Sequence, residues 1–107
     1  VRTLLSDSKV EVNTKGHDYQ TPLHVAAIEG HLGCVKALLE DKRVEVNSCD
    51  DKKITPLSHA AQTGNKEIVE LLLDDSRVDV TKVDEDGKTA LHMAAHSGNT
   101  DLVQILI

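Results

Sequence analysis

A short helical pattern of small and apolar residues lies near the middle of the chain. Leu57 and the alanines at 60–61 share one face of a helix that Thr55 can cap at its N-terminus. Pro56 suits the first helical position, where a missing N–H costs nothing. Gly64 ends the pattern because glycine tolerates the positive φ of a helix C-terminus. The spacing predicts a first helix between the proline and the glycine.

A second helical pattern follows directly, and Asn65 can open it. Its apolar residues recur at helical spacing: Ile68, Val69, Leu72 and Leu73. Residues 77–80 then alternate between polar and apolar, as a half-buried extended segment does. Residues 84–87 have the composition of a turn. Neither helix is long enough to be stable alone, so each unit needs neighbours to pack against.

The whole pattern recurs every 34 residues without a gap. The aligned positions include Thr21, Thr55 and Thr89, then Leu23, Leu57 and Leu91, then Gly30, Gly64 and Gly98. A register this strict predicts a stacked solenoid in which each repeat packs against the next.

The repeats divide the chain as one domain over residues 1–107. Residues 1–13 correspond to the end of a truncated repeat, and 14–47 and 48–81 are whole repeats, called repeat one and repeat two below. Residues 82–107 form an incomplete repeat, called repeat three. Because the sequence starts at a valine rather than a methionine, we expect it to be a piece of a longer protein.

The start of each repeat resembles the T-P-L-H signature of the ankyrin-repeat family: Thr21-Pro22-Leu23-His24, Thr55-Pro56-Leu57-Ser58 and Thr89-Ala90-Leu91-His92. The family's Ala-Ala, Gly, Val-x-x-Leu-Leu and Val-Asn elements follow in order over nearly the whole chain. The resemblance implies an all-α solenoid of helix-turn-helix units joined by β-hairpin loops. Tetratricopeptide repeats have the same period, but their pattern needs Trp and Phe, and this chain has neither.

Some positions depart from the family pattern. The glycine two residues before the threonine is kept only at Gly87, while Tyr19 and Lys53 replace it in the other two turns. We expect those turns to differ in shape, because glycine adopts positive φ cheaply. Ser58 stands in place of the family's histidine and is followed by His59. Some hydrogen bonding between repeats should therefore be missing there, and a satisfied, partly buried role is expected for His59.

Composition and charge exclude several classes of function. The net charge of −6 opposes a nucleic-acid surface, which needs a basic stripe. No apolar run approaches the roughly 18 residues of a membrane span, and no signal pattern is present, so membrane insertion is not expected. Cys34 and Cys49 have neither metal-ligand nor disulfide spacing. Free thiols fit an intracellular location, which we expect to be the cytoplasm, with the nucleus as the alternative.

The sequence offers no site for a metal, a cofactor or catalysis. His92 and His96 lie four residues apart, but the zinc-protease pattern needs a glutamate where Met93 stands. The resemblance gives His24 and His92 a structural role instead, joining the threonine hydroxyl to the neighbouring loop. Residues 84–86 lack the ligand spacing of a calcium loop and are expected to form a solvated turn. We therefore expect the protein not to be an enzyme.

The resemblance implies recognition of a protein partner through one concave face, which is made of the hairpin tips and the first helices. The loop-tip set comprises His17, Asp18, Tyr19, Gln20, Asp51, Lys52, Ile54, Glu85, Asp86 and Lys88. The set at the end of each first helix comprises Ile28, Glu29, Gln62, Thr63, His96 and Ser97. Local packing is an equally good interpretation of Tyr19. The alternative function is a regulatory or spacer segment of a larger enzyme or channel, without a partner of its own.

Two further hypotheses concern particular residues. Asn13 and Asn47 each follow a leucine by eight residues, an acid by two and an aliphatic residue by one. In the resembled family such asparagines can be hydroxylated, and a bracing role in the hairpin is the more conservative interpretation. Both ends of the chain are also apolar, at Val1, Leu4 and Leu5 and at Leu102, Val103, Leu106 and Ile107. These ends predict marginal stability or end-to-end association unless flanking repeats are restored.

Overall fold

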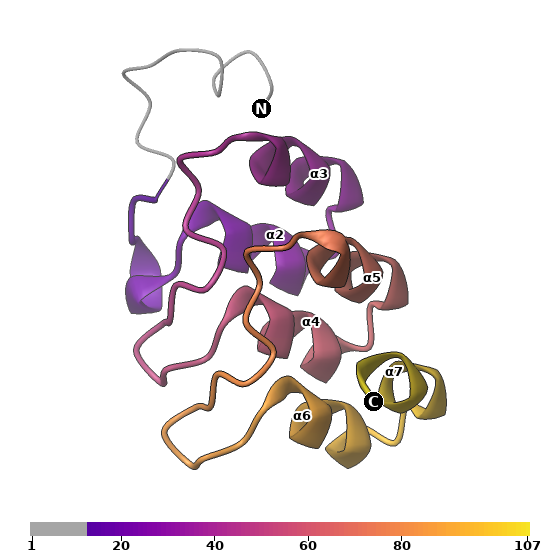
Figure 1. The fold of residues 1–107 in the computed structure, drawn as a ribbon. Coiled ribbons are helices and arrows are strands. Elements are labelled where there is room, and N and C mark those ends of the chain that lie inside the picture. Colours follow the sequence, from indigo (N-terminus) through magenta and orange to yellow (C-terminus); the bar gives the residue numbers. More distant parts are fainter. Residues whose placement is uncertain (1–12) are drawn as a thin grey trace.

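The computed structural model describes residues 13–107, and the expectations for Val1, Leu4 and Leu5 lie outside that range. Three pairs of helices stack in one direction along the molecule (Figure 1). A single 3-10 turn, η1, precedes them. The bounds are η1 His17–Tyr19, α2 Pro22–Glu29, α3 Leu32–Glu40, α4 Pro56–Thr63, α5 Lys66–Asp74, α6 Ala90–His96 and α7 Thr100–Leu106.

The helix boundaries predicted for repeat two are confirmed. The Thr55 hydroxyl accepts a hydrogen bond from the Ser58 N–H at 3.2 Å, and α4 begins at Pro56. Gly64 ends this helix with φ 79°, in the left-handed region. The Asn65 side chain then caps α5 through a hydrogen bond of 3.3 Å. Local capping chemistry thus fixes where each helix begins and ends.

The helices form two layers. The first helices α2, α4 and α6 pack side by side, and the second helices α3, α5 and α7 pack behind them (Figure 1). Alanines let the first layer pack closely, and Ala27, Ala60, Ala61 and Ala94 are fully buried. Bulkier aliphatic side chains fill the space between the layers: Leu23, Leu57, Ile68, Leu72 and Leu102. The core is therefore continuous from one repeat to the next.

The β-hairpin part of the predicted fold is not confirmed. No strand occurs within residues 13–107, where all the regular structure is helical. Residues 78–79, predicted to be extended, have no regular structure, and residues 80–81 form a turn. Successive loops touch through isolated backbone bonds, from Asp51 N–H to the Asp18 carbonyl and from Glu85 N–H to the Lys52 carbonyl, both at 3.1 Å. Single bonds of this kind do not make a strand ladder.

The loop turns resemble one another more than the sequence suggested. Lys53 has φ 63° and Gly87 has φ 76°, so both are left-handed. The Lys53 N–H donates to the Asp50 carbonyl just as the Gly87 N–H donates to the Asp84 carbonyl, both at 3.0 Å. The prediction that the turn at Lys53 differs in shape is therefore wrong. The hydrogen bonds of the turn hold the lysine in the left-handed conformation that glycine favours. The turn at Tyr19 does differ, since its neighbouring residue also has positive φ.

Lys53→Gly is expected to raise the free energy of unfolding by about 0.5–1 kcal/mol, because it removes the strain of a left-handed side chain. Part of that gain is offset by the greater freedom of glycine in the unfolded chain. Urea denaturation measures the change. Lys52→Gly is the matched control: Lys52 is not among the positive-φ residues, and this substitution should destabilise. Equal effects of the two substitutions would contradict the account.

Candidate functional site

Two buried carboxylates hold the loop tips in shape. Asp50 Oδ1 accepts hydrogen bonds from the backbone N–H groups of Lys52 and Ile54, both at 2.9 Å. Asp84 Oδ1 holds the next tip through the same two positions, again at 2.9 Å. Both aspartates are buried, at 7% and 8% exposure. The expectation of a solvated turn at residues 84–86 is therefore wrong for Asp84, whose carboxylate faces its own backbone. Gly16 takes this position in the first tip, which has no such clamp.

His59 completes the clamp in repeat two. Its Nε2 lies 2.7 Å from Asp50 Oδ2, and the two side chains are 12% and 3% exposed. The expectation of a satisfied, partly buried histidine is confirmed. Burial works against ionisation of Asp50, but hydrogen bonds from the Ile54 N–H, the His59 ring and the Lys52 N–H outweigh it. The pKa of Asp50 is therefore held below its usual range, and the carboxylate stays ionised.

His24 joins repeat one to the loop of repeat two, as expected. The Thr21 N–H donates to His24 Nδ1 at 3.1 Å, so the ring proton is on Nε2. Nε2 then donates to the Ile54 carbonyl at 2.8 Å. Burial lowers the pKa of His24 below its ordinary value, and the nearby His59, whose ring centroid is 5.7 Å away, lowers it further. The junction thus depends on a neutral imidazole.

The unfolding free energy is expected to fall as the pH is lowered from 7 to 5. A depressed pKa means that the unfolded chain, with His24 near its ordinary value of about 6.5, binds more protons than the folded protein. Stability is then fully present above that value and declines below it. His24→Gln should reduce the slope of the unfolding free energy against pH, which is measured by chemical denaturation at several pH values. His31→Gln, at an exposed histidine, should keep the parent slope. If the unfolding free energy of His24→Gln depended on pH as steeply as that of the parent, the role assigned to His24 would be wrong.

The other two repeats lack this junction. Ser58 accepts a bond from the Thr55 hydroxyl at 3.3 Å, and no bond reaches from it to repeat three within the described part of the chain. The missing inter-repeat bond expected at this position is confirmed. His92 contacts the Thr89 hydroxyl at 2.9 Å, as His24 contacts Thr21, but its side chain is exposed. His92 and His96 therefore lie on an open face of α6.

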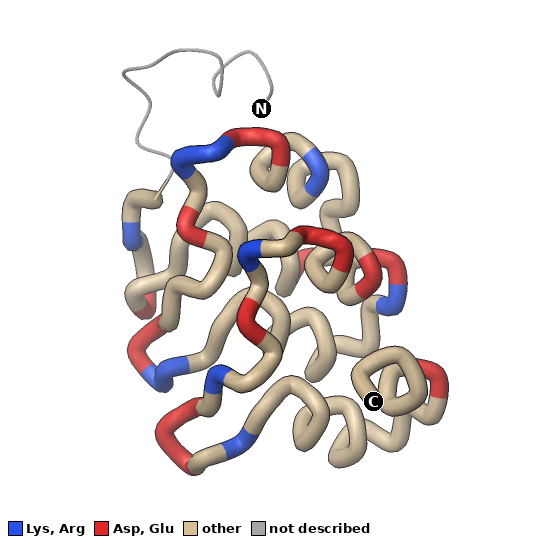
Figure 2. Tube along the Cα trace, viewed as in Figure 1, with Lys and Arg blue, Asp and Glu red and all other residues tan. Residues whose placement is uncertain are grey.

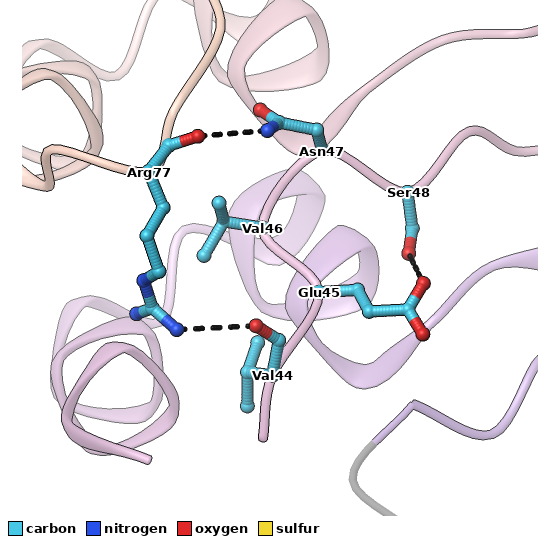
Figure 3. A pocket seen from close by; sticks show the side chains of 6 residues that line it. All are labelled: Val44, Glu45, Val46, Asn47, Ser48 and Arg77. Carbon is cyan, nitrogen blue, oxygen red and sulfur yellow. Dashed lines mark hydrogen bonds between the residues drawn. The ribbon is translucent and has the colours of Figure 1, made fainter. Parts of the chain in front are cut away.

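Asparagine side chains join successive loops in the same direction, from one repeat to the next. Asn47 Nδ2 donates to the Arg77 carbonyl at 2.8 Å (Figure 3). Asn47 Oδ1 accepts from the Asp79 N–H, also at 2.8 Å. Asn13 makes the same pair of bonds with the loop of repeat one, at 2.8 and 2.7 Å. The bracing role is confirmed, but each asparagine braces the next repeat's loop rather than its own.

The Arg77 side chain contacts the preceding repeat. Its guanidinium donates to the carbonyl of Leu39, in the last turn of α3, at 2.9 Å. It also donates to the carbonyl of Val44, beyond the end of α3, at 3.2 Å (Figure 3). Asp75 orients the guanidinium at 2.7 Å, and that contact lowers the pKa of Asp75. A cation is favourable there because a helix C-terminus carries partial negative charge. Sequence reasoning missed this contact, although the recurring Asp-x-Arg at 41–43 and 75–77 was its signal.

The side-chain bonds between loops, the threonine and asparagine caps and the alanine layer recur with the sequence period. A family model described as ankyrin repeats, in three copies, matches residues 1–84 and 42–107. The chain belongs to the ankyrin-repeat family. Ankyrin repeats are generally protein–protein interaction modules and are typically non-catalytic. No curated protein matches the chain.

The ankyrin loop tips form a row along one edge of the molecule, and both acidic and basic residues occur there (Figure 2). Most of the predicted loop-tip residues are exposed, and only Gln20 and Ile54 are half-buried. Tyr19 is 64% exposed, which argues against a role in local packing. The backbone bonds from Asp51 to Asp18 and from Glu85 to Lys52 fix the spacing of the row.

The second predicted set lies at the far end of the first helices. Ile28, Glu29 and Thr63 line a shallow hollow of about 440 Å³ beside the start of α5. Gln62, His96 and Ser97 are exposed at the corresponding helix ends. Because an eight-residue helix is about 12 Å long, this set is separate from the loop tips. The two sets of candidate residues are therefore separated by about the length of one first helix.

Within residues 13–107, no three His, Cys, Asp or Glu side chains come together in a way that could hold a metal ion. Among the helices of the same range, none has the length and apolar character needed to cross a membrane. Cys34 and Cys49 are both half-buried and free.

Proposed function

We propose that this ankyrin chain binds a protein partner through its loop tips, with the first-helix ends as a second contact. The observation that supports this is the clamped row of tips. Asp50 and Asp84 fix two tips from inside, so that the intervening residues project outward in a set register. A surface that is ordered before binding loses less conformational entropy when it binds.

The charge of the tips indicates the chemistry of the partner. Asp18, Asp51 and residues 85–86 are exposed acids, and Lys52 and Lys88 lie among them. We propose a polar interface with a basic or mixed-charge partner, and association that weakens with salt. Tyr19 is the aromatic residue of this row and would bury a large area at low entropic cost.

A charge-reversal pair tests the surface once affinity capture and cross-linking have supplied a partner. Asp51→Lys combined with Asp86→Lys is expected to weaken binding at least tenfold, mainly by slowing association. Glu70→Lys, on the exposed side of α5, should change binding less than twofold. Surface plasmon resonance at two salt concentrations measures both. If the partner tolerates the first variant and is lost with the second, the loop-tip assignment fails. If the folded chain captures no partner, a regulatory or spacer role is favoured instead.

We propose that Asn13 and Asn47 are acceptors for an asparaginyl hydroxylase. The motif supports this, and the paired side-chain bonds of each amide mean that its loop must open before modification. Peptide mass spectra of the chain expressed in a eukaryotic host should show one added oxygen on either residue. Unmodified peptides would discard the proposal.

We propose an intracellular location, supported by two cysteines that remain free. Fractionation of cells expressing the chain should place it in the cytoplasm or the nucleus.

A further inference from the structure

The loop tip of repeat two is held at both of its ends by histidines. At its start, Asp50 binds the backbone of the tip through Oδ1, and its Oδ2 lies 2.7 Å from His59 Nε2. At its end, the Ile54 carbonyl accepts from His24 Nε2 at 2.8 Å. The two rings also contact each other edge to face, with centroids 5.7 Å apart. Residues 51–53 therefore lie between two points that are fixed by His24 and His59, called the histidine frame below.

The tip of repeat three has the same backbone turn without either histidine contact. Asp84 clamps that turn through Oδ1, but no partner for its Oδ2 occurs among the described residues. Met93 takes the repeat position of His59, and Ser58 takes that of His24. Both differences lie at the junction of repeats two and three, inside the chain. The histidine frame therefore distinguishes the tip of repeat two by its own sequence.

Lys53 is the residue that the histidine frame encloses in a disfavoured conformation. Its φ of 63° lies in the left-handed region, and repeat three has Gly87 at the same position. A strained residue persists only where its surroundings over-determine its conformation, and such residues gather at functional sites. Gly87 presents no side chain, whereas Lys53 is exposed and has no ion-pair partner within residues 13–107. The strained turn therefore presents one additional cation at the tip.

We propose that the tip of repeat two anchors the partner, an inference that rests on the loop-tip function above. Lys53 is the contact residue, and its unpaired ammonium meets an acidic side chain of a mixed-charge partner. His59 is a positioning residue, since it holds the second oxygen of Asp50 and thereby the turn. A lysine whose backbone is already fixed loses less entropy on binding than one in a free loop.

Amide hydrogen exchange followed by NMR tests the positioning role of His59. His59→Leu should make the N–H groups of Lys52 and Ile54 exchange about tenfold faster, because Asp50 loses the donor to its second oxygen. His59→Gln keeps a donor and should retain most of the protection. Amides in the middle of α5 should exchange as in the parent in both variants, which separates opening of the tip from loss of the fold.

Met93→His tests the same role by adding the contact to repeat three. The substituted side chain takes the position that His59 takes in repeat two, with Asp84 in place of Asp50. The N–H groups of Asp86 and Lys88 should then exchange more slowly than in the parent. Unchanged exchange at these amides, or parent-like exchange at the repeat-two tip in His59→Leu, would overturn the positioning role.

Surface plasmon resonance with the partner from the capture experiment tests Lys53. Lys53→Gln should weaken binding about tenfold, and Lys53→Arg should keep most of it. Lys36→Gln, the same change at an exposed position of α3, is the control and should bind like the parent. Lys53→Gly should bind weakly although it is more stable than the parent. A merely structural role of Lys53 would not produce that opposite pair of effects.

The outcomes separate this anchor from the loop-tip function as a whole. If Asp51→Lys with Asp86→Lys loses binding while Lys53→Gln binds like the parent, the anchor is overturned and the loop-tip function stands. If none of these variants affects binding, or if the folded chain captures no partner, both are overturned.

Discussion

Leu72→Ala is expected to lower the free energy of unfolding by about 2–5 kcal/mol. Leu72 is fully buried in α5, which packs between α3 and α7. Removing its isopropyl group leaves a cavity that two neighbouring helices bound, and a stacked core collapses only partly around it. Small domains have only about 5–15 kcal/mol of stability in total, so this loss is a large fraction of it.

Urea denaturation followed by circular dichroism measures the effect of Leu72→Ala. Leu91→Ala is the matched control, since it removes the same atoms from a side chain that is 38% exposed. We expect that control to cost less than about 1 kcal/mol, because less apolar area returns to water. Similar losses in the two variants would mean that the second-helix layer is not the tightly packed core described above.

Ala61→Leu is expected to destabilise the protein by about 1–3 kcal/mol through overpacking. Ala61 is fully buried in α4, where the first helices of three repeats lie side by side. A larger side chain there must push α4 away from a neighbour or adopt a strained rotamer. The small residue is thus as necessary to the stack as the large ones behind it.

Ala95→Leu is the control for Ala61→Leu, because Ala95 holds the same repeat position but is exposed on α6. Its unfolding free energy in dilute solution should lie within about 0.5 kcal/mol of the parent value. An unchanged melting curve for Ala61→Leu would indicate a looser stack than the burial implies. A large loss of unfolding free energy in Ala95→Leu would indicate that the side of α6 that carries Ala95 is covered.

The positions of the caps and helices could be predicted from the sequence by itself. Thr55, Pro56, Gly64 and Asn65 act on backbone groups within a few residues of themselves, so their roles follow from local chemistry. The 34-residue register also predicted which residues share a face and that the loop tips would project. Short-range hydrogen bonding and periodic burial are readable from spacing, because they repeat with the chain.

Only the tertiary structure decided which polar groups the stacking brings together. The Asp50 carboxylate contacts His59 nine residues away, and Arg77 contacts the Leu39 carbonyl 38 residues away. Asp84 is as acidic in composition as its neighbours, yet it is buried while they are exposed. The conformation of Lys53 could not be predicted from its residue type either, because the hydrogen bonds of its turn impose a backbone conformation that its side chain disfavours. Long-range contacts and burial depend on the position of the neighbouring repeat. A local pattern such as the recurring Asp-x-Arg marks a residue for such a contact but does not give its partner.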